Sequence, residues 1–204
     1  MSVQHVEFLV EEASMEAALR VLLPRLLGPT SFDVHPYQGK GDLLKRLPQR
    51  LRGYAAWLPA TSRVVVVIDR DNDDCVALKA RLDEMAAAAG LTPRSRSTGN
   101  AYALVNRLAI EELEAWFFGD WEAVRTAYPR VSASVPSQAR YRDPDCVAGG
   151  TWEAFERVLR NAGYFRGGLR KIEAARSIAE HMEPHRNTSR SFHALRVALL
   201  EMAS

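Results

Sequence analysis

A run of β-branched residues in the middle of the chain constrains the fold more than any other feature. The sequence RVVVVI occupies residues 63–68, and it carries no charged residue after Arg63. A continuous apolar stretch of this kind is typical of a central parallel strand that helices cover on both faces. It ends at the acidic stretch DRDNDD, and a helical pattern starts at Val76. We therefore expect a buried strand, an acidic loop and a helix in succession.

The same alternation of strand and helix recurs over roughly the first 120 residues. Turn residues such as Gly28-Pro29 separate the successive elements. The patterns predict strands near 3–10, 31–37, 63–68 and 104–110, and helices near 15–26, 43–51, 76–85 and 111–121. Pro48 is expected to kink or break the second helix. This order of elements predicts an α/β fold with a mainly parallel sheet flanked by helices.

The character of the chain changes after Tyr128. Residues 129–150 are rich in Pro, Ser and Gly and are expected to form an irregular connection. Helices are predicted near 151–162, 168–182 and 191–203, the last with Ser191 as its cap. We therefore predict two units. Residues 1–125 form the sheet domain, and residues 126–204 form a helical C-terminal extension packed on it.

Composition narrows the class of protein. No apolar run approaches the about 18 residues that a membrane span needs, and the N-terminal residues read as a strand rather than a signal peptide. The two cysteines, Cys75 and Cys146, are far apart and suggest neither a disulfide framework nor a structural zinc site. These features predict a cytoplasmic protein without a membrane partner. The formal net charge of +2 does not by itself indicate a protein that binds nucleic acid.

Acidic residues follow three of the four predicted strands. They are Glu11 and Glu12, then Asp69, Asp71, Asp73 and Asp74, then Glu111, Glu112 and Glu114. In open α/β sheets ligands bind at the carboxyl edge, and clustered carboxylates repel each other unless a cation neutralises them. All-oxygen ligation suits Mg²⁺, Mn²⁺ or Ca²⁺. The alternative is that these acids are solvated loop residues and helix caps, and we favour it for Asp73, Asp74, Glu12 and Glu111 but not for Asp69 and Asp71.

The stretch after Ile68 also invites three other interpretations. An EF-hand loop that started at Asp69 would need Gly at its sixth position and Glu at its twelfth, where this chain has Asp74 and Ala80. A haloacid-dehalogenase-type phosphatase carries its D-x-D on the first strand, whereas this one follows the third. A nucleotide-sugar glycosyltransferase also uses D-x-D on a metal, and this interpretation stays open.

Several sequence blocks together resemble one family. FLVEEASMEAAL at the first strand and VVVVIDRDND at the third resemble the Toprim domain, whose signature is a Glu after its first strand and a D-x-D after its third. With YQGKGDLLKRL, AIEELEAWFFGD and NTSRSF, nearly the full chain resembles a bacterial Toprim-related family of unknown function, domain of unknown function 4276. That family is related to the Toprim domains of OLD-type nucleases.

The resemblance implies a set of site residues. Glu11 matches the Toprim Glu, and Asp69 and Asp71 match the D-x-D; these three are the predicted catalytic and metal-binding residues. Glu114 is the candidate that completes the ligand set for Mg²⁺ or Mn²⁺, and Lys40 is the candidate that contacts a phosphate. Two departures stand out. The Toprim Glu is usually followed by Gly, where this chain has Glu12, and the family has an acidic residue where this chain has Met15.

The resemblance also implies a function. It predicts a Mg²⁺-dependent nuclease that hydrolyses phosphodiesters in DNA or RNA, acting in phage defence with an ABC- or AAA-type ATPase as partner. A homodimer is left open. The alternative is a non-catalytic metal-binding or partner-binding module of such a defence system, which the two departures at Glu12 and Met15 favour.

Overall fold

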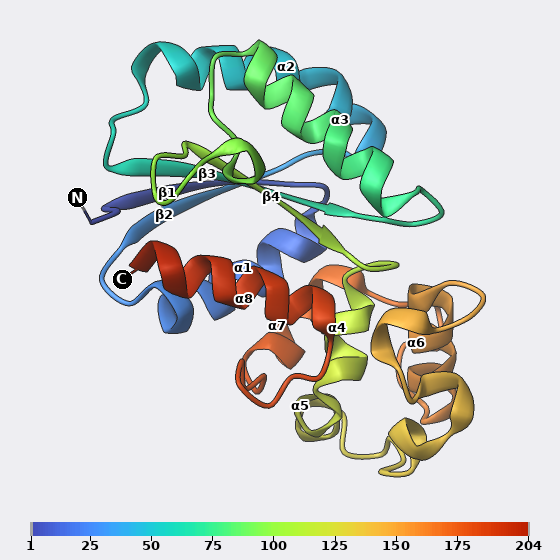
Figure 1. Ribbon diagram of the computed structural model, residues 1–204. Helices are drawn as coiled ribbons and strands as arrows, with labels where there is room; N and C mark the ends of the chain where they lie inside the picture. The colour runs from blue at the N-terminus through green and yellow to red at the C-terminus, as the bar shows by residue number, and fades with distance from the viewer. Residues whose placement is uncertain (1, 204) are drawn as a thin grey trace.

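The computed structural model describes residues 2–203, and they form an α/β fold around one parallel sheet (Figure 1). The strands are β1 (His5–Val10), β2 (Ser31–Pro36), β3 (Ser62–Asp69) and β4 (Leu104–Ala109). They lie in the order β2-β1-β3-β4, and every neighbouring pair is parallel. The predicted fold class is therefore confirmed.

Helices cover both faces of the sheet. The helices of the first part of the chain are α1 (Ala13–Leu27), α2 (Lys40–Trp57), α3 (Cys75–Ala88), α4 (Glu114–Gly119) and α5 (Trp121–Ala127). Those of the last part are α6 (Thr151–Asn161), α7 (Lys171–Ala179) and α8 (Arg190–Ala203). In Figure 1, α2 and α3 lie on one face of the sheet, and α1 and α8 lie on the other.

The central strand explains this layering. Along β3, Val64, Val66 and Ile68 join the apolar cluster under α2 and α3, while Val65 and Val67 join the larger cluster that includes α1, α7 and α8. Successive side chains of a strand point to opposite faces, so a run of apolar residues supplies both clusters at once. The interpretation of RVVVVI as a central strand is confirmed.

Three local expectations need correction. Of the kink or break predicted at Pro48, the break is wrong: α2 runs through Pro48, and Leu43, Leu47, Leu51 and Tyr54 bury one side of the helix, which offsets the lost hydrogen bond. The single helix predicted over 111–121 is two helices, since Asp120 leaves the helical conformation and its side chain caps α5.

The predicted cap of the last helix is also wrong. Ser191 lies inside α8, and the Ser189 hydroxyl accepts from the backbone N–H of Phe192 instead. Ser189 stands three residues before Phe192, which is the spacing of an N-cap bond.

The connection between α5 and α6 contains only short helical turns. They are η2 (Val135–Ser137), η3 (Ala139–Tyr141) and η4 (Pro144–Cys146), while η1 (Arg94–Arg96) precedes β4. The division of the chain into 1–125 and 126–204 stays a prediction; α1, α4, α7 and α8 share one apolar cluster. Cys75 and Cys146 are free thiols.

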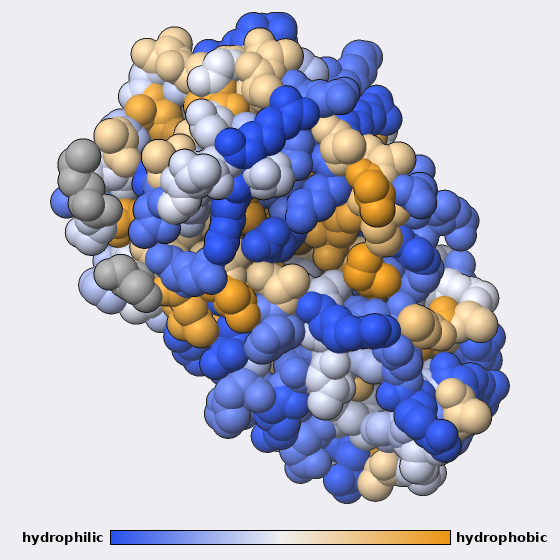
Figure 2. All heavy atoms as spheres, in the orientation of Figure 1, coloured by the Kyte–Doolittle hydropathy of each residue, from blue (hydrophilic) through white to orange (hydrophobic). Residues whose placement is uncertain are grey.

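Hydrophilic side chains predominate on the face drawn in Figure 2, with the hydrophobic ones in small separate groups. None of the helices that the structure describes combines the length and the apolar composition needed to cross a membrane.

Candidate metal centre

The sheet topology brings the predicted acidic residues to one edge. β1 and β4 both pair with β3, so the carboxyl ends of these three strands are neighbours. Glu11 directly follows β1, Asp69 is the last residue of β3, and Glu114 begins α4 shortly after β4. A hydrogen bond joins the first two, since the Asp69 backbone N–H donates to Glu11 Oε2 at 3.1 Å.

Asp69 is the central residue of this edge. Its side chain is buried, with a relative exposure of 6%, and its Oδ1 has no hydrogen-bond partner among the described residues. Burial raises the pKa of Asp69 well above its ordinary value, and the neighbouring Glu11 and Glu114 raise it further. A buried carboxylate oxygen without a donor is costly. A cation at this position would remove that cost.

Glu114 contributes a second buried carboxylate. It is 2% exposed, and burial raises its pKa to about 7, although Lys171 works in the opposite direction. Burial also raises the pKa of Glu11, with the Asp71 carboxylate adding to the effect. Burial and nearby carboxylates therefore disfavour the ionisation of Glu11, Asp69 and Glu114, as expected for a site that needs positive charge.

Asp71 lies at the rim, in a loop held in an unusual conformation. Its backbone has a positive φ of 50°, and Glu111 opposite it has a φ of 55°. The Asp71 backbone N–H donates to the Glu111 carbonyl at 2.9 Å, which joins the loops after β3 and β4. Non-glycine residues with positive φ are uncommon and concentrate at functional sites.

Lys40 approaches the same rim from the N-terminus of α2. Its Nζ lies 2.6 Å from Asp71 Oδ2 and 2.9 Å from Asp73 Oδ2, and it donates to the Arg70 carbonyl at 2.9 Å. Burial lowers the pKa of Lys40, but the two aspartates outweigh that effect and raise it. The predicted phosphate-binding lysine is thus adjacent to the cluster and contacts the D-x-D itself.

The neighbouring acids have structural partners. The Asp74 side chain accepts from the Ala77 backbone N–H and caps α3, so the interpretation of Asp74 as a cap is confirmed. Glu111 pairs with Arg70. Glu112 Oε2 accepts from the Trp152 backbone N–H at 2.9 Å, which attaches the start of α6 to this edge.

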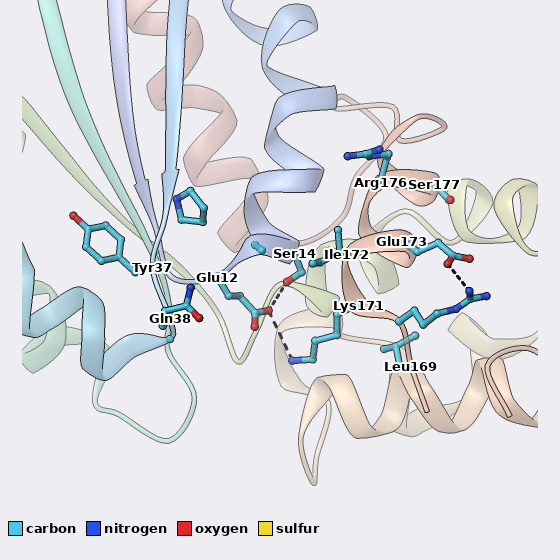
Figure 3. Close-up of a pocket in the computed structure, with 14 residues that line it drawn as sticks. Glu12, Ser14, Tyr37, Gln38, Leu169, Lys171, Ile172, Glu173, Arg176 and Ser177 are labelled. Carbon is cyan, nitrogen blue, oxygen red and sulfur yellow. Dashed lines mark hydrogen bonds and ion pairs between the residues drawn. The ribbon is translucent and has the colours of Figure 1, made fainter. Parts of the chain in front are cut away.

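Sequence reasoning missed Lys171, the first residue of α7. Its Nζ lies 3.8 Å from Glu12 Oε1, and Figure 3 shows it pointing toward Glu12. Burial lowers the pKa of Lys171, yet Glu114, Glu12 and other nearby carboxylates raise it overall. No local pattern around residue 171 signals this role, because α7 reaches the site only through the packing of the C-terminal helices on α1.

The structure accommodates the two departures from the Toprim pattern, Glu12 and Met15, in different ways. Glu12 has an extended backbone with φ −146°, which any residue can adopt, so glycine is not required here. Met15 is fully buried in the core, and Glu16 pairs with Arg20 on the surface of α1. Neither Met15 nor Glu16 therefore offers a carboxylate in place of the acid that the family carries at position 15.

The carboxylates of this edge are close without converging on one point. Among the residues that the structure describes, only His5, Glu7 and Asp33 place three potential metal ligands within 4.8 Å of one another. Mg²⁺ commonly keeps several waters and uses only one or two carboxylates directly. The donor set at Asp69 therefore fits a hydrated Mg²⁺ or Mn²⁺ better than a fully protein-coordinated ion.

Two clefts flank the cluster. One, of about 880 Å³, is lined by Glu12, residues 36–39 and residues 169–173 of the segment entering α7 (Figure 3). The other, of about 910 Å³, is lined by residues 70–72, Glu111, Glu112 and the glycine-containing segment 146–150. Glu12 lines the first cleft and Asp71 lines the second, whereas Glu11, Asp69 and Glu114 line neither of these two.

The fold and this edge define an α/β protein with a carboxylate cluster at the carboxyl ends of a parallel sheet. The chain matches the family described as "Domain of unknown function (DUF4276)" over residues 10–200 and belongs to that family. The family predicted from the sequence blocks is therefore confirmed.

The chain was also compared with solved structures and with curated proteins. A solved structure of the C-terminal region of the OLD protein from Xanthomonas campestris pv. campestris is similar at 16% identity, with a TM-score of 0.42. The similarity covers 97% of this chain and 94% of that one. The comparison with curated proteins gave no match.

Proposed function

We propose that the protein hydrolyses phosphodiester bonds in nucleic acid with a divalent ion, Mg²⁺ or Mn²⁺, held at the carboxyl edge of the sheet. One observation carries the proposal: Asp69 Oδ1 is buried without a hydrogen-bond donor, beside Glu11 and Glu114. A structural ion pair would have satisfied that oxygen with Lys or Arg. Carboxylate oxygens are the ligands that Mg²⁺ and Mn²⁺ prefer.

The roles follow from the positions of the side chains. Asp69 and Glu11 would hold the ion, with Asp71 and Glu114 completing the set directly or through water. When bound, the ion would polarise a phosphate oxygen and lower the pKa of a water molecule. Alternatively, Glu11 would act as the general acid or base through Oε1, because its Oε2 already accepts from the Asp69 backbone N–H.

Lys40 is proposed to contact the phosphate. It is now paired with Asp71 and Asp73, and an ion at Asp71 would release its ammonium group toward an incoming anion. The open clefts on both sides of the cluster suit an extended strand of DNA or RNA. The ATPase partner and the role in phage defence are part of the same proposal and rest on the family resemblance, whereas the proposed cytoplasmic location rests on the composition of the sequence.

The test is cleavage of supercoiled plasmid, single-stranded DNA and RNA in Mg²⁺, Mn²⁺ or EDTA. Wild-type protein is expected to cut at least one substrate only with metal. Asp69→Asn and Asp71→Asn are each expected to reduce the rate by at least about a hundredfold. Asp73→Asn is the matched control, since Asp73 also pairs with Lys40 but lies outside the proposed ligand set, and it should stay close to wild type.

One observation favours the non-catalytic alternative. Lys40 and Lys171 already balance part of the acidic charge, at Asp71 and Glu12 respectively. A module of this kind would bind the ion or a partner ATPase without turnover. Metal-independent cleavage, or equal cleavage by wild type and Asp69→Asn, would overturn the proposed activity; stable partner binding without cleavage would support the module.

A further inference from the structure

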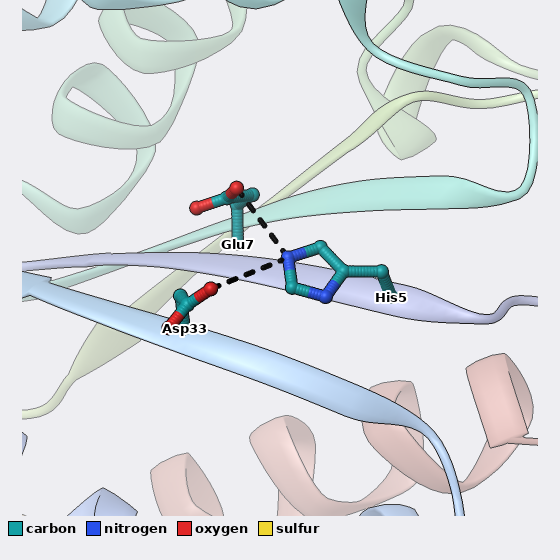
Figure 4. A group of neighbouring side chains, drawn as sticks. All are labelled: His5, Glu7 and Asp33. Atoms are coloured by element: carbon teal, nitrogen blue, oxygen red, sulfur yellow. Dashed lines mark ion pairs between the residues drawn. The ribbon is translucent and has the colours of Figure 1, made fainter.

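A second cluster of potential ligands lies on β1 and β2, away from the carboxyl edge. It consists of His5, Glu7 and Asp33, which Figure 4 shows with the His5 ring facing both carboxylates. The parallel register sets Glu7 beside Asp33, and the alternation along β1 places His5 and Glu7 on one face. The register of the sheet therefore fixes the distances between these side chains.

Those distances resemble the edges of a tetrahedral site. His5 Nε2 lies 3.4 Å from Glu7 Oε1 and 3.9 Å from Asp33 Oδ2. Two ligand atoms that are each about 2.0–2.1 Å from a tetrahedral Zn²⁺ are about 3.3 Å apart. The first distance matches this value, and binding would bring the exposed Asp33 side chain closer to His5.

The hydrogen bonds of His5 define which ring nitrogen is available. Ser31 Oγ donates its single proton to the Gln4 carbonyl at 2.9 Å, so it accepts from His5 Nδ1, also at 2.9 Å. A neutral His5 therefore carries its proton on Nδ1 and directs the Nε2 lone pair at two carboxylates. Metal-binding histidines characteristically donate their second ring N–H to an oxygen in this way.

Glu7 is oriented by two neighbouring side chains. Its Oε2 contacts His35 Nε2 at 2.6 Å and accepts from the Tyr54 hydroxyl at 3.0 Å, which leaves Oε1 facing His5. Groups outside the three ligands therefore hold the carboxylate in place.

We propose that His5, Glu7 and Asp33 bind Zn²⁺ at the edge of the sheet, independently of the carboxylates around Asp69. The imidazole nitrogen distinguishes this site from the all-oxygen edge, because it suits Zn²⁺ rather than Mg²⁺. Two carboxylates and a neutral imidazole balance the charge of the ion. The side chains of His5 and Asp33 are 27% and 63% exposed, which gives the ion a path from solvent and leaves a fourth position for water.

The test is Zn²⁺ titration by calorimetry with Mg²⁺ in large excess, so that the carboxyl edge is occupied. Wild-type protein is expected to bind one Zn²⁺ per chain, and His5→Ala and Asp33→Asn are each expected to abolish that binding. Tyr54→Phe, which removes one donor to Glu7, should weaken it by about tenfold to a hundredfold. Asp33 is exposed, so Asp33→Asn tests the site even if His5→Ala does not fold.

Two controls separate this site from others. His185→Ala removes an exposed histidine that lies 3.8 Å from Glu183 and belongs to no group of three potential ligands in the described part of the chain, and Asp69→Asn disables the carboxyl edge; both should bind Zn²⁺ as wild type does. Co²⁺ in place of Zn²⁺ should give visible absorption bands of tetrahedral type that His5→Ala removes. Absence of Zn²⁺ binding in wild type, or binding unchanged in both His5→Ala and Asp33→Asn, would overturn the proposal and leave an ordinary ion pair of protonated His5.

Discussion

At the scale of single residues, the buried aspartates differ in what their carboxylates contact. Asp83 accepts from Ser95 and Asn106, and Asp120 accepts from Arg186 and two backbone N–H groups. Asp145 accepts from Ser189, Ser191 and the Arg190 backbone N–H. Asp69 has an oxygen with no partner among the described residues. That contrast is the basis for assigning a ligand role to Asp69 rather than a structural one.

The contrast predicts opposite effects of the same substitution. In EDTA, Asp69→Asn is expected to raise the free energy of unfolding by about 1 kcal/mol or more, because it removes a buried, repelled charge. Asp83→Asn is expected to lower it by about 1–3 kcal/mol, because it leaves a buried donor without its acceptor. Urea unfolding of both variants checks this. Equal destabilisation by the two would contradict the assignment of Asp69.

Glu114 makes the stability depend on pH. Its pKa is about 7 in the folded protein against an ordinary value of 4.5, so the folded state binds the proton more tightly. Stability is then lost as pH rises from 4.5 to 7 and is flat above that range. In EDTA, the gain in stability from Glu114→Gln should be larger at pH 8 than at pH 4.5 by on the order of 3 kcal/mol. A gain that is the same at both pH values would show that Glu114 titrates normally.

At the scale of elements, the block NTSRSF joins the last helix to the middle of the chain. Asn187 Nδ2 donates to the Trp116 carbonyl, and Trp116 Nε1 donates to Ser191 Oγ at 3.1 Å. A Cβ at Gly119 would collide with Asn187 Oδ1 and lie 2.8 Å from the Ser189 backbone nitrogen, so only glycine permits this approach. The two sequence blocks EAWFFGD and NTSRSF therefore fit each other, and their pattern reflects packing between α4 and α8.

Asp145 is the centre of this junction, which gives a direct test. Asp145→Ala leaves two buried hydroxyls and a backbone N–H without their acceptor, and it is expected to lower the free energy of unfolding by about 2–4 kcal/mol. Asp143→Ala is the control, since the half-exposed Asp143 pairs with the exposed Arg190 side chain and accepts from the Asp145 backbone N–H at 3.1 Å, and its loss should cost only about 1 kcal/mol. Thermal unfolding distinguishes the two; similar losses would remove Asp145 from the centre of the junction.

At the scale of the whole molecule, the parallel sheet could be predicted from the sequence because each strand carries its own pattern. RVVVVI signals burial on both faces, and the acids that follow Val10 and Ile68 mark the ends of adjacent strands. Lys171 could not be predicted, since its position depends on how α7 packs against α1 far along the chain. The split at Asp120 was hidden because the aromatic residues around it give a continuous apolar pattern, although Gly119 and Asp120 are poor helix formers and the Asp120 side chain caps α5.

The central claim is that the carboxyl edge of the sheet holds a divalent ion, and calorimetric titration of Mg²⁺ and Mn²⁺ tests it most directly. The account predicts binding by wild-type protein that is lost in Asp69→Asn and retained in Asp73→Asn, His5→Ala and Asp33→Asn. Bound metal should also stabilise the wild-type fold, by about 2.7 kcal/mol at a free concentration near 100 times Kd. No binding by wild type even with nucleic acid present, or equal binding by wild type and Asp69→Asn, would contradict the account.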